Sequence, residues 1–393
     1  MDDAALTAKS DLFDSESLLT DEERRTRARI ARFNADHAAP GAAERWVEGR
    51  MALELVPELT RLGVYGGGVQ GYGCSGLGDV ADGLVAAELA KVDFGLSAFF
   101  GIHGVLTLRA ISSLGTPEQK SRWLPGMADG SSIGALGITE PDHGSDTAGI
   151  ETRARSVEGG FRITGRKRWV GNASVADLTV VFAKDDHDAV AAFVVPGGSE
   201  GFQATPIEGK IGMRSSWPTD IVLEDVFVPS DHRLDGADGP QIAGAFNAVR
   251  PIAAWQALGL SIGAFEATLT YLDAREQFGS PLTSFQLVQH KLAEMAVAIS
   301  SMRLTCIRVS RALQDGSLTH VMASAAKMLC ARQGRSVVST ARDLMGGNGL
   351  LADRVVGRHF ADMEAVFTYD GTDHIQSLIV GKAITGRSAF RRA

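Results

Sequence analysis

Four stretches of the chain combine glycine, charged and aromatic residues in patterns that suit a ligand with phosphate groups and a planar ring. They read GITEPDHGSD at 137–146, GRKRWVGN at 165–172, REQFGSPL at 275–282 and DLMGGNG at 343–349. Phe285 and Gln286 follow the third stretch, and YDGT at 369–372 follows the fourth.

Each residue type in these stretches has a physical use. A Thr-Glu-Pro turn at 139–141 followed by Gly-Ser at 144–145 exposes backbone N–H groups, which suit a pyrophosphate. Trp169 lies in a predicted strand and can face an aromatic ring, and Arg275 offers a cation for a phosphate. Taken singly, each stretch also fits a structural interpretation as a tight turn, a core tryptophan or a solvated arginine.

Two other motifs lack the structural context that their chemistry requires. Residues 71–76, GYGCSG, match the dinucleotide pattern G-x-G-x-x-G, but a predicted helix precedes them where a strand is needed. Residues 130–134, GSSIG, match G-x-S-x-G, but they lead from a helix into a strand, the reverse of a nucleophile elbow. Scattered histidines and three cysteines give no metal-site spacing. We therefore interpret both motifs as turns and expect no bound metal.

The elements that position the four stretches follow the order helix, strand, helix. Thr20 to Glu23 form a capping box, and helices are predicted around Leu55–Leu62 and over Val80–Lys91. Short β-rich runs at 133–139, 159–170, 178–184, 189–196 and 219–229 come next. Long helical patterns follow near 243–275, 285–313 and 320–344. We predict a mostly α, α+β chain with domains at 1–132, 133–238 and 239–393.

Composition narrows the class of protein. The 393 residues are 45% hydrophobic and 22% charged, with a net charge of −8, so a nucleic-acid partner is not expected. No apolar run is expected to reach the roughly 18 residues of a membrane helix, so no membrane partner is expected. The acidic N-terminus lacks signal-peptide and transit-peptide character, which predicts a cytoplasmic protein.

Together the motifs resemble the acyl-CoA dehydrogenase family over essentially the whole chain. The resemblance also rests on GYGC at 71–74, NAVR at 247–250, and the ending from EAV at 364–366 to AITG at 383–386. Within the family the chain is most similar to the glutaryl-CoA dehydrogenase branch. The family implies an N-terminal helical domain, a central β-domain, a C-terminal four-helix bundle, FAD, and a homotetramer in which a neighbouring subunit completes each FAD site.

The resemblance carries roles onto individual residues of this chain. The cofactor-binding residues it implies are Leu136, Ile138, Thr139, Gly144, Ser145, Trp169, Val170, Gly171, Arg275, Gln277, Phe278, Gln286, Asp343, Gly346, Gly347 and Thr372. The substrate-binding residues it implies are Ser97, Ser145, Phe246, Asn247, Arg250, Tyr369 and Gly371. The implied partners are an acyl-CoA, or an acyl-carrier thioester, and an electron-transfer flavoprotein as electron acceptor.

The family's reaction takes an α-proton to a carboxylate while the β-hydrogen leaves as hydride to the flavin, and Asp370 matches the position of that base. Three residues depart from the family pattern. Asp370 replaces the usual Glu, Gly171 replaces a Thr or Ser whose hydroxyl bonds flavin N5, and Ser97 stands where glutaryl-CoA dehydrogenases place Arg. A glutaryl substrate is therefore not expected. The alternatives are a flavin monooxygenase on the same fold and a non-catalytic FAD-binding homologue.

Overall fold

The computed structural model describes residues 6, 8–236 and 248–389. Its first part is helical, and a 3₁₀ turn, η1 (Ser15–Leu18), precedes α2. The predicted capping box starts α2: Thr20 Oγ1 accepts from the Glu23 amide at 3.2 Å, and Glu23 Oε2 accepts from the Thr20 amide at 2.8 Å. The helices are α2 (Asp21–Phe33), α3 (Ala42–Glu48), α4 (Val56–Arg61), α5 (Asp79–Ala90), α6 (Phe94–Phe100), the π-helical η4 (Gly101–Thr107), α7 (Leu108–Leu114) and α8 (Pro117–Ala128). Residues 71–76 lie between α4 and α5, as predicted for a turn.

The central part is a seven-stranded sheet with the order β1-β4-β2-β3-β7-β6, and β5 pairs with β4. The strands are β1 (Gly134–Gly137), β2 (Arg153–Val157), β3 (Gly160–Gly171), β4 (Leu178–Lys184), β5 (Val190–Pro196), β6 (Phe202–Pro206) and β7 (Pro218–Pro229). Five of these strands were predicted. Sequence reasoning missed β2 and β6, because β2 buries only Ala154 and β6 buries no residue fully, so neither shows a run of apolar residues.

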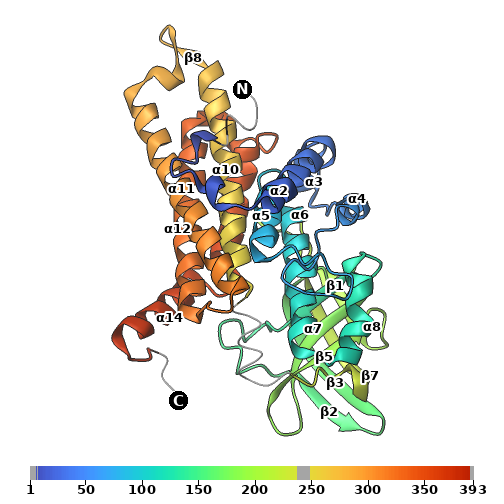
Figure 1. Ribbon diagram of the computed structural model, residues 1–393. Coiled ribbons are helices and arrows are strands. Elements are labelled where there is room, and N and C mark those ends of the chain that lie inside the picture. The colour runs from blue at the N-terminus through green and yellow to red at the C-terminus, as the bar shows by residue number, and fades with distance from the viewer. Residues whose placement is uncertain (1–5, 7, 237–247, 390–393) are drawn as a thin grey trace.

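The last part is a helical bundle in which α12 packs against α10, α11, α13 and α14 (Figure 1). Its elements are α10 (Arg250–Ala274), the hairpin of β8 (Glu276–Gln277) and β9 (Ser280–Pro281), α11 (Gln286–Gln314), α12 (His320–Leu344), the 3₁₀ turn η7 (Gly346–Leu350), α13 (Val355–Thr368) and α14 (Asp373–Thr385). The predicted helix from 243 instead begins at Arg250 among the described residues. Pro251 in the first turn is compatible with this start, since an amide is not needed for an intrahelical hydrogen bond there. Residues 243–247 of the predicted helix lie outside the described residues.

Two stretches are long and apolar enough to cross a membrane by length and composition alone. They are Phe94–Leu114 and Arg250–Ala274, and 83% and 94% of their apolar windows are buried inside the fold. Both therefore serve here as core helices, with α10 packed against α5 and α12. The expectation that no stretch reaches this length was wrong, because scattered glycine, serine and polar residues interrupt the runs without ending the helices.

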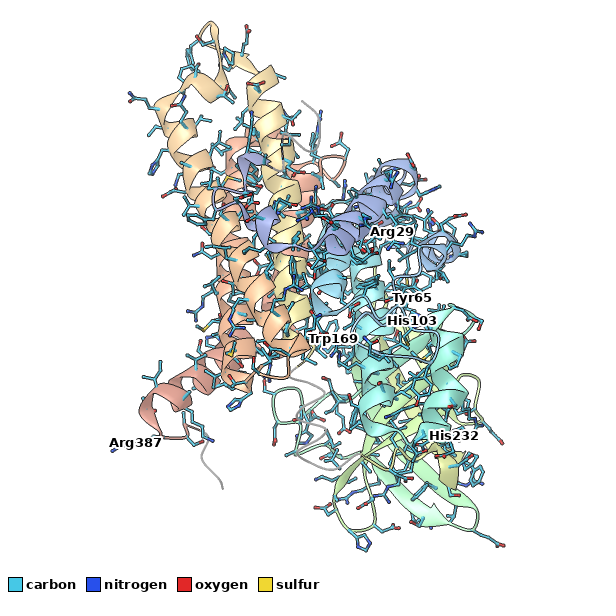
Figure 2. The ribbon with its side chains drawn as sticks, viewed as in Figure 1. Arg29, Tyr65, His103, Trp169, His232 and Arg387 are labelled. Carbon is cyan, nitrogen blue, oxygen red and sulfur yellow. The ribbon has the colours of Figure 1, made fainter. Side chains whose placement is uncertain are left out.

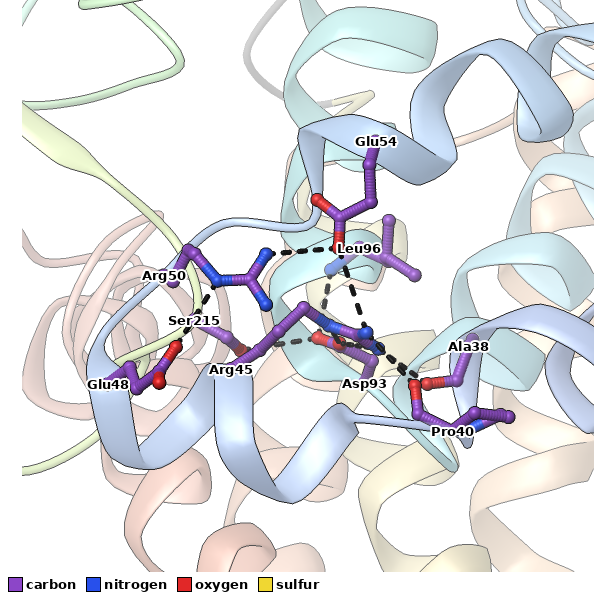
Figure 3. Close-up of polar contacts among 9 residues, drawn as sticks. All are labelled: Ala38, Pro40, Arg45, Glu48, Arg50, Glu54, Asp93, Leu96 and Ser215. Atoms are coloured by element: carbon purple, nitrogen blue, oxygen red, sulfur yellow. Dashed lines mark hydrogen bonds and ion pairs between the residues drawn. The ribbon is translucent and has the colours of Figure 1, made fainter.

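A buried ion pair within the N-terminal helices also carries a contact to the β-domain (Figure 3). Arg45 of α3 donates from Nε and NH2 to Asp93 Oδ2, both at 3.1 Å. Asp93 Oδ1 accepts from the Ser215 hydroxyl at 3.2 Å, in the loop before β7. The same carboxylate caps α6 by accepting from the Gly95 amide at 2.9 Å. One aspartate thus fixes three segments that are distant in sequence.

Candidate functional site

The turn between α13 and α14 holds Asp370 in an uncommon backbone conformation. Asp370 has φ of 51° and Gly371 has φ of 84°, so two consecutive residues occupy the left-handed region. This region suits glycine and is unfavourable for a side-chain-bearing residue, so the surroundings must hold it there. Thr372 ends the turn and caps α14, because its hydroxyl accepts from the Ile375 amide at 3.3 Å.

Three helices hold this turn by hydrogen bonds. From α10, Gln256 Oε1 accepts from the Tyr369 hydroxyl at 2.5 Å. From α12, Lys327 Nζ donates to the Gly371 carbonyl at 2.7 Å. From α14, Gln376 Nε2 donates to the carbonyls of Asp370 at 2.9 Å and of Gly371 at 3.0 Å. The position of the Asp370 side chain is therefore set by the bundle rather than by its own loop.

Two cations share the surroundings of the Asp370 carboxyl. Burial raises the pKa of Asp370, while the charges of Lys327 and Arg250 lower it. The residue is nevertheless exposed to solvent, so the desolvation comes from the protein around one open side. Burial lowers the pKa of Lys327 to about 8, and the Asp370 and Asp373 carboxylates oppose that shift. A carboxyl with a raised pKa beside fixed cations is suited to accept a proton from a bound molecule.

The first two sequence stretches meet in the β-domain. The Arg168 amide donates to the Thr139 carbonyl at 2.8 Å, which joins the loop after β1 to β3. Beneath this contact, buried Lys167 donates from Nζ to the Ile138 carbonyl at 3.1 Å and to Glu140 Oε1 at 2.7 Å. The Glu140 carboxylate also accepts from the amides of residues 151 and 152. Gly144 and Ser145 stay exposed on this anchored loop.

Trp169 projects from a break in β3, where pairing with β7 shifts register between Lys167 and Val170. Its φ of 61° and the register shift turn the side chain away from the sheet, and 53% of the residue is exposed. The Arg168 guanidinium lies 5.2 Å from the indole centroid. Figure 2 places Trp169 where the β-domain approaches the lower end of the helices. The prediction placed Trp169 in a strand, and only the bulge explains its exposure.

The space beside Gly171, which follows Val170, is filled by a side chain from a helix. A Cβ at Gly171 would overlap the Cδ1 atom of Ile102, which lies on the π-helical segment η4. Gly171 is buried, and Leu136 and Val170 are also buried, so these three implied cofactor residues offer their backbone more than their side chains.

The implied cofactor residues from Arg275 to Gln286 and from Asp343 to Gly347 lie at the far end of the bundle. Asn348 Nδ2 donates to the Tyr271 hydroxyl at 3.0 Å, which joins the stretch at 343–349 to the end of α10. The 25 residues of α10 separate Arg250, near Asp370, from Arg275 by about 37 Å. Figure 1 shows the β8 hairpin and α14 at opposite ends of the molecule. The residues at this far end that are exposed are Arg275, Gln277, Phe278, Gln286, Asp343, Gly346 and Gly347. The four stretches therefore form two separate groups in one chain.

The implied substrate residues are partly gathered and partly buried. Arg250, Tyr369 and Gly371 lie with Asp370, while Phe246 and Asn247 lie outside the described residues. Ser97 is completely buried, and its hydroxyl donates to the Ala86 carbonyl at 2.7 Å. The backbone carbonyl of Ser97 accepts from Gln256 Nε2 at 3.0 Å. Ser97 thus reaches Asp370 only through Gln256 and Tyr369.

The residues present fit FAD. An exposed indole held by a bulge offers a face to a planar ring, and the exposed Gly144–Ser145 turn offers backbone to phosphate. Arg275 adds an exposed cation at the far end of the bundle. A helical, β and helical chain with these two groups defines a flavin-dependent oxidoreductase.

Family models for the acyl-CoA dehydrogenase N-terminal, middle and C-terminal domains match residues 20–131, 135–226 and 238–385. A short-chain specific acyl-CoA dehydrogenase from Clostridium acetobutylicum is 33% identical over 93% of this chain and 98% of its own length. The chain belongs to the acyl-CoA dehydrogenase family. The predicted fold, FAD dependence and enzyme class are thereby confirmed.

Two solved structures extend this result. A glutaryl-CoA dehydrogenase from Mycobacterium smegmatis, in complex with FADH2, is 35% identical with a TM-score of 0.94, covering 98% of this chain and 100% of that one. A chain in a structure described as the electron transferring flavoprotein of Acidaminococcus fermentans is 28% identical with a TM-score of 0.91, covering 94% of this chain and 99% of that one.

Sequence reasoning missed the residues that hold the turn. Gln256, Lys327 and Gln376 lie in three different helices, and each of these polar side chains is buried. A lysine inside the apolar run at 325–331 was the one available signal. Lys167 was quoted within a motif, but its pairing with Glu140 was not predicted.

Proposed function

We propose that this protein removes one hydrogen from each of the α- and β-carbons of an acyl thioester, with Asp370 as the base that takes the α-proton. The observation that carries the proposal is the Asp370 carboxyl, held in a left-handed turn by three helices and flanked by Lys327 and Arg250. The α-C–H electron pair forms the new double bond, the proton passes to the carboxylate, and the β-hydrogen leaves as hydride. FAD, when bound, supplies the hydride acceptor.

The raised pKa of Asp370 supports this role. A base works best when its pKa lies near the working pH, and burial moves this carboxyl upward from its usual range. A bound acyl thioester excludes water from the open side of Asp370, which raises the pKa further. The two flanking cations keep the carboxyl ionised enough to accept the proton.

Anaerobic mixing of the purified holoenzyme with a panel of acyl-CoA thioesters tests the proposal. We expect loss of flavin absorbance with at least one thioester, and Asp370→Asn should abolish it while leaving FAD and acyl-CoA binding largely intact, because the side chain keeps its size and loses its basic site. Asp370→Glu reports whether the pocket is built for the longer carboxylate. Normal bleaching by the Asn variant would remove Asp370 from this role, and new oxygen in the product would favour a monooxygenase.

We propose an acyl thioester other than glutaryl-CoA as substrate. Ser97 carries no charge, and it is buried with its hydroxyl engaged, so it offers nothing to a second carboxylate. Turnover of butyryl-CoA and glutaryl-CoA by the same preparation tests this, and efficient release of CO₂ from glutaryl-CoA would contradict it.

We propose that each FAD binds between two subunits of a homotetramer. The first set of its contacts is Leu136, Ile138, Thr139, Gly144, Ser145, Trp169, Val170, Gly171 and Thr372. The second set, at the far end of the bundle, comes from a neighbouring subunit. The length of α10 supports this, because it places Arg275 about 37 Å from Arg250, which lies near Asp370 and Thr372. A cofactor bound near Thr372 would then meet the far-end residues of a second chain and not those of its own.

An electron-transfer flavoprotein is the electron acceptor that we propose, together with a cytoplasmic location. The likeness to a chain of the Acidaminococcus fermentans structure supports the acceptor. Three free cysteines support a reducing compartment. Reoxidation of the reduced enzyme by a purified electron-transfer flavoprotein, faster than by O₂, is the expected result, and cell fractionation tests the location.

A further inference from the structure

Two buried side chains converge on the backbone of the turn that carries Asp370. Lys327 and Gln376 have no exposed surface, and their nitrogen atoms reach the carbonyls of residues 370 and 371. Lys327 Nζ also donates to the Phe367 carbonyl at 3.4 Å, in the last turn of α13. Lys327 therefore pairs one carbonyl that the end of α13 leaves without an intrahelical partner, and both side chains pair carbonyls of the turn itself.

These contacts matter because the turn is locally unfavourable. A side-chain-bearing residue with φ of 51° relaxes toward other regions unless its neighbours prevent it. A relaxed turn would move the Asp370 carboxylate. Since Asp is one methylene shorter than Glu, the Asp370 side chain cannot extend further to compensate for such a movement.

We propose that Lys327 and Gln376 are positioning residues for Asp370, which clamp the carbonyls of residues 370 and 371 and so hold the carboxylate where it meets the α-proton. This inference rests on the proposed function, because it takes Asp370 as the base. The two residues differ in one respect. Lys327 supplies both a clamp and a positive charge, whereas Gln376 supplies a clamp alone.

That difference gives a matched pair of variants, Lys327→Met and Gln376→Met, which keep a similar length and remove the donor. We expect both to slow flavin reduction by a good acyl-CoA by about 10- to 100-fold, the order of loss that misplacement by about 1 Å causes. FAD content should match the wild-type enzyme in both. Lys327→Arg, which keeps the charge and the donors, should recover most of the rate.

The pH profile separates the two roles. Flavin reduction rises with pH as Asp370 loses its proton, and the Lys327 charge lowers the pKa of that carboxyl. Lys327→Met should therefore move the rising limb to higher pH, and Gln376→Met should leave it in place. Arg250, Tyr369 and Asp373 also face this site and remain in both variants, so their influence is common to the pair.

A readout without turnover is the double-mutant cycle on stability. For Lys327→Met and Asp370→Asn, the loss in free energy of unfolding of the holoenzyme at neutral pH should differ from the sum of the two single losses. Gln376→Met and Asp370→Asn should not show a coupling of that sign. Wild-type rates in both Met variants, with Asp370→Asn inactive, would overturn the positioning role alone. Normal flavin reduction by Asp370→Asn would overturn both proposals. An unshifted pH limb in Lys327→Met, with no coupling, would overturn the electrostatic part.

Discussion

Gly171 and Ile102 share one space between the β-domain and η4. The overlap of a Cβ at 171 with Ile102 Cδ1 means that the helix side chain occupies the place that a family Thr or Ser would take. The departure at Gly171 is therefore matched by a residue that lies 69 positions earlier in the chain. In this protein an aliphatic group fills the place of a hydroxyl.

This pairing predicts a non-additive response to substitution. Gly171→Ala should lower the free energy of unfolding by about 1–3 kcal/mol, because it overpacks a buried position. Ile102→Val removes the Cδ1 methyl and should itself cost about 1 kcal/mol. The double variant should be more stable than the sum of the two losses predicts, as measured by chemical denaturation. Gly381→Ala, where a Cβ meets no atom within 4 Å, is the control and should not destabilise. Simple additivity would contradict the shared space.

At the scale of elements, the loop after β1 depends on the pair formed by Glu140 and Lys167. The Glu140 side chain is 5% exposed, and Lys167 is fully buried. Burial acts to raise the pKa of Glu140. Hydrogen bonds from the Glu151 amide, the Lys167 side chain and Thr152 outweigh this effect and hold the pKa at about 2. Burial lowers the pKa of Lys167 to about 8, and Glu140 opposes that shift. The loop that carries Gly144 and Ser145 is thus anchored by one carboxylate.

Glu140→Gln should destabilise the protein by about 3 kcal/mol at pH 7, because it leaves Lys167 buried without its carboxylate. Lys167→Met combined with Glu140→Gln should recover part of that loss. Because the folded pKa of Glu140 lies below its ordinary value of 4.5, its stabilisation is complete above about 4.5 and is lost as pH falls toward about 2. The difference between wild type and Glu140→Gln in urea denaturation should therefore shrink in acid. A difference that is constant from pH 7 to pH 3 would contradict this.

At the scale of the whole molecule, two large apolar side chains are exposed at the far end of the bundle. Phe278 is 95% exposed in the β8–β9 hairpin, which directly follows Arg275, and Leu287 is 80% exposed in the first turn of α11. Such a surface is typical of one that a partner covers. In the proposed homotetramer, this surface completes the FAD site of a neighbouring subunit.

Subunit complementation tests that arrangement. Arg275→Ala and Asp370→Asn should each be defective alone, because one loses the cofactor cation and the other the base. Co-expressed in one oligomer, they should regain about a quarter of wild-type activity, because random mixing places an intact Asp370 beside a neighbour's intact Arg275 at about that fraction of sites. No recovery in verified mixed oligomers would place both residues in the same subunit's site. Light scattering should give a particle of several times 41.6 kDa.

The sequence by itself determined the order of helices and strands, the cap at Thr20, and the identity of the Asp370 turn, because these depend on residues a few positions apart. It left β2 and β6 unseen, because edge and exposed strands carry no apolar alternation. Only the tertiary structure decided that the four stretches separate to opposite ends of α10, that Ile102 fills the place beside Gly171, and that Lys327 and Gln376 hold the Asp370 turn. These contacts join residues from different elements, and their formation depends on how helices pack, which no local pattern in the sequence contains.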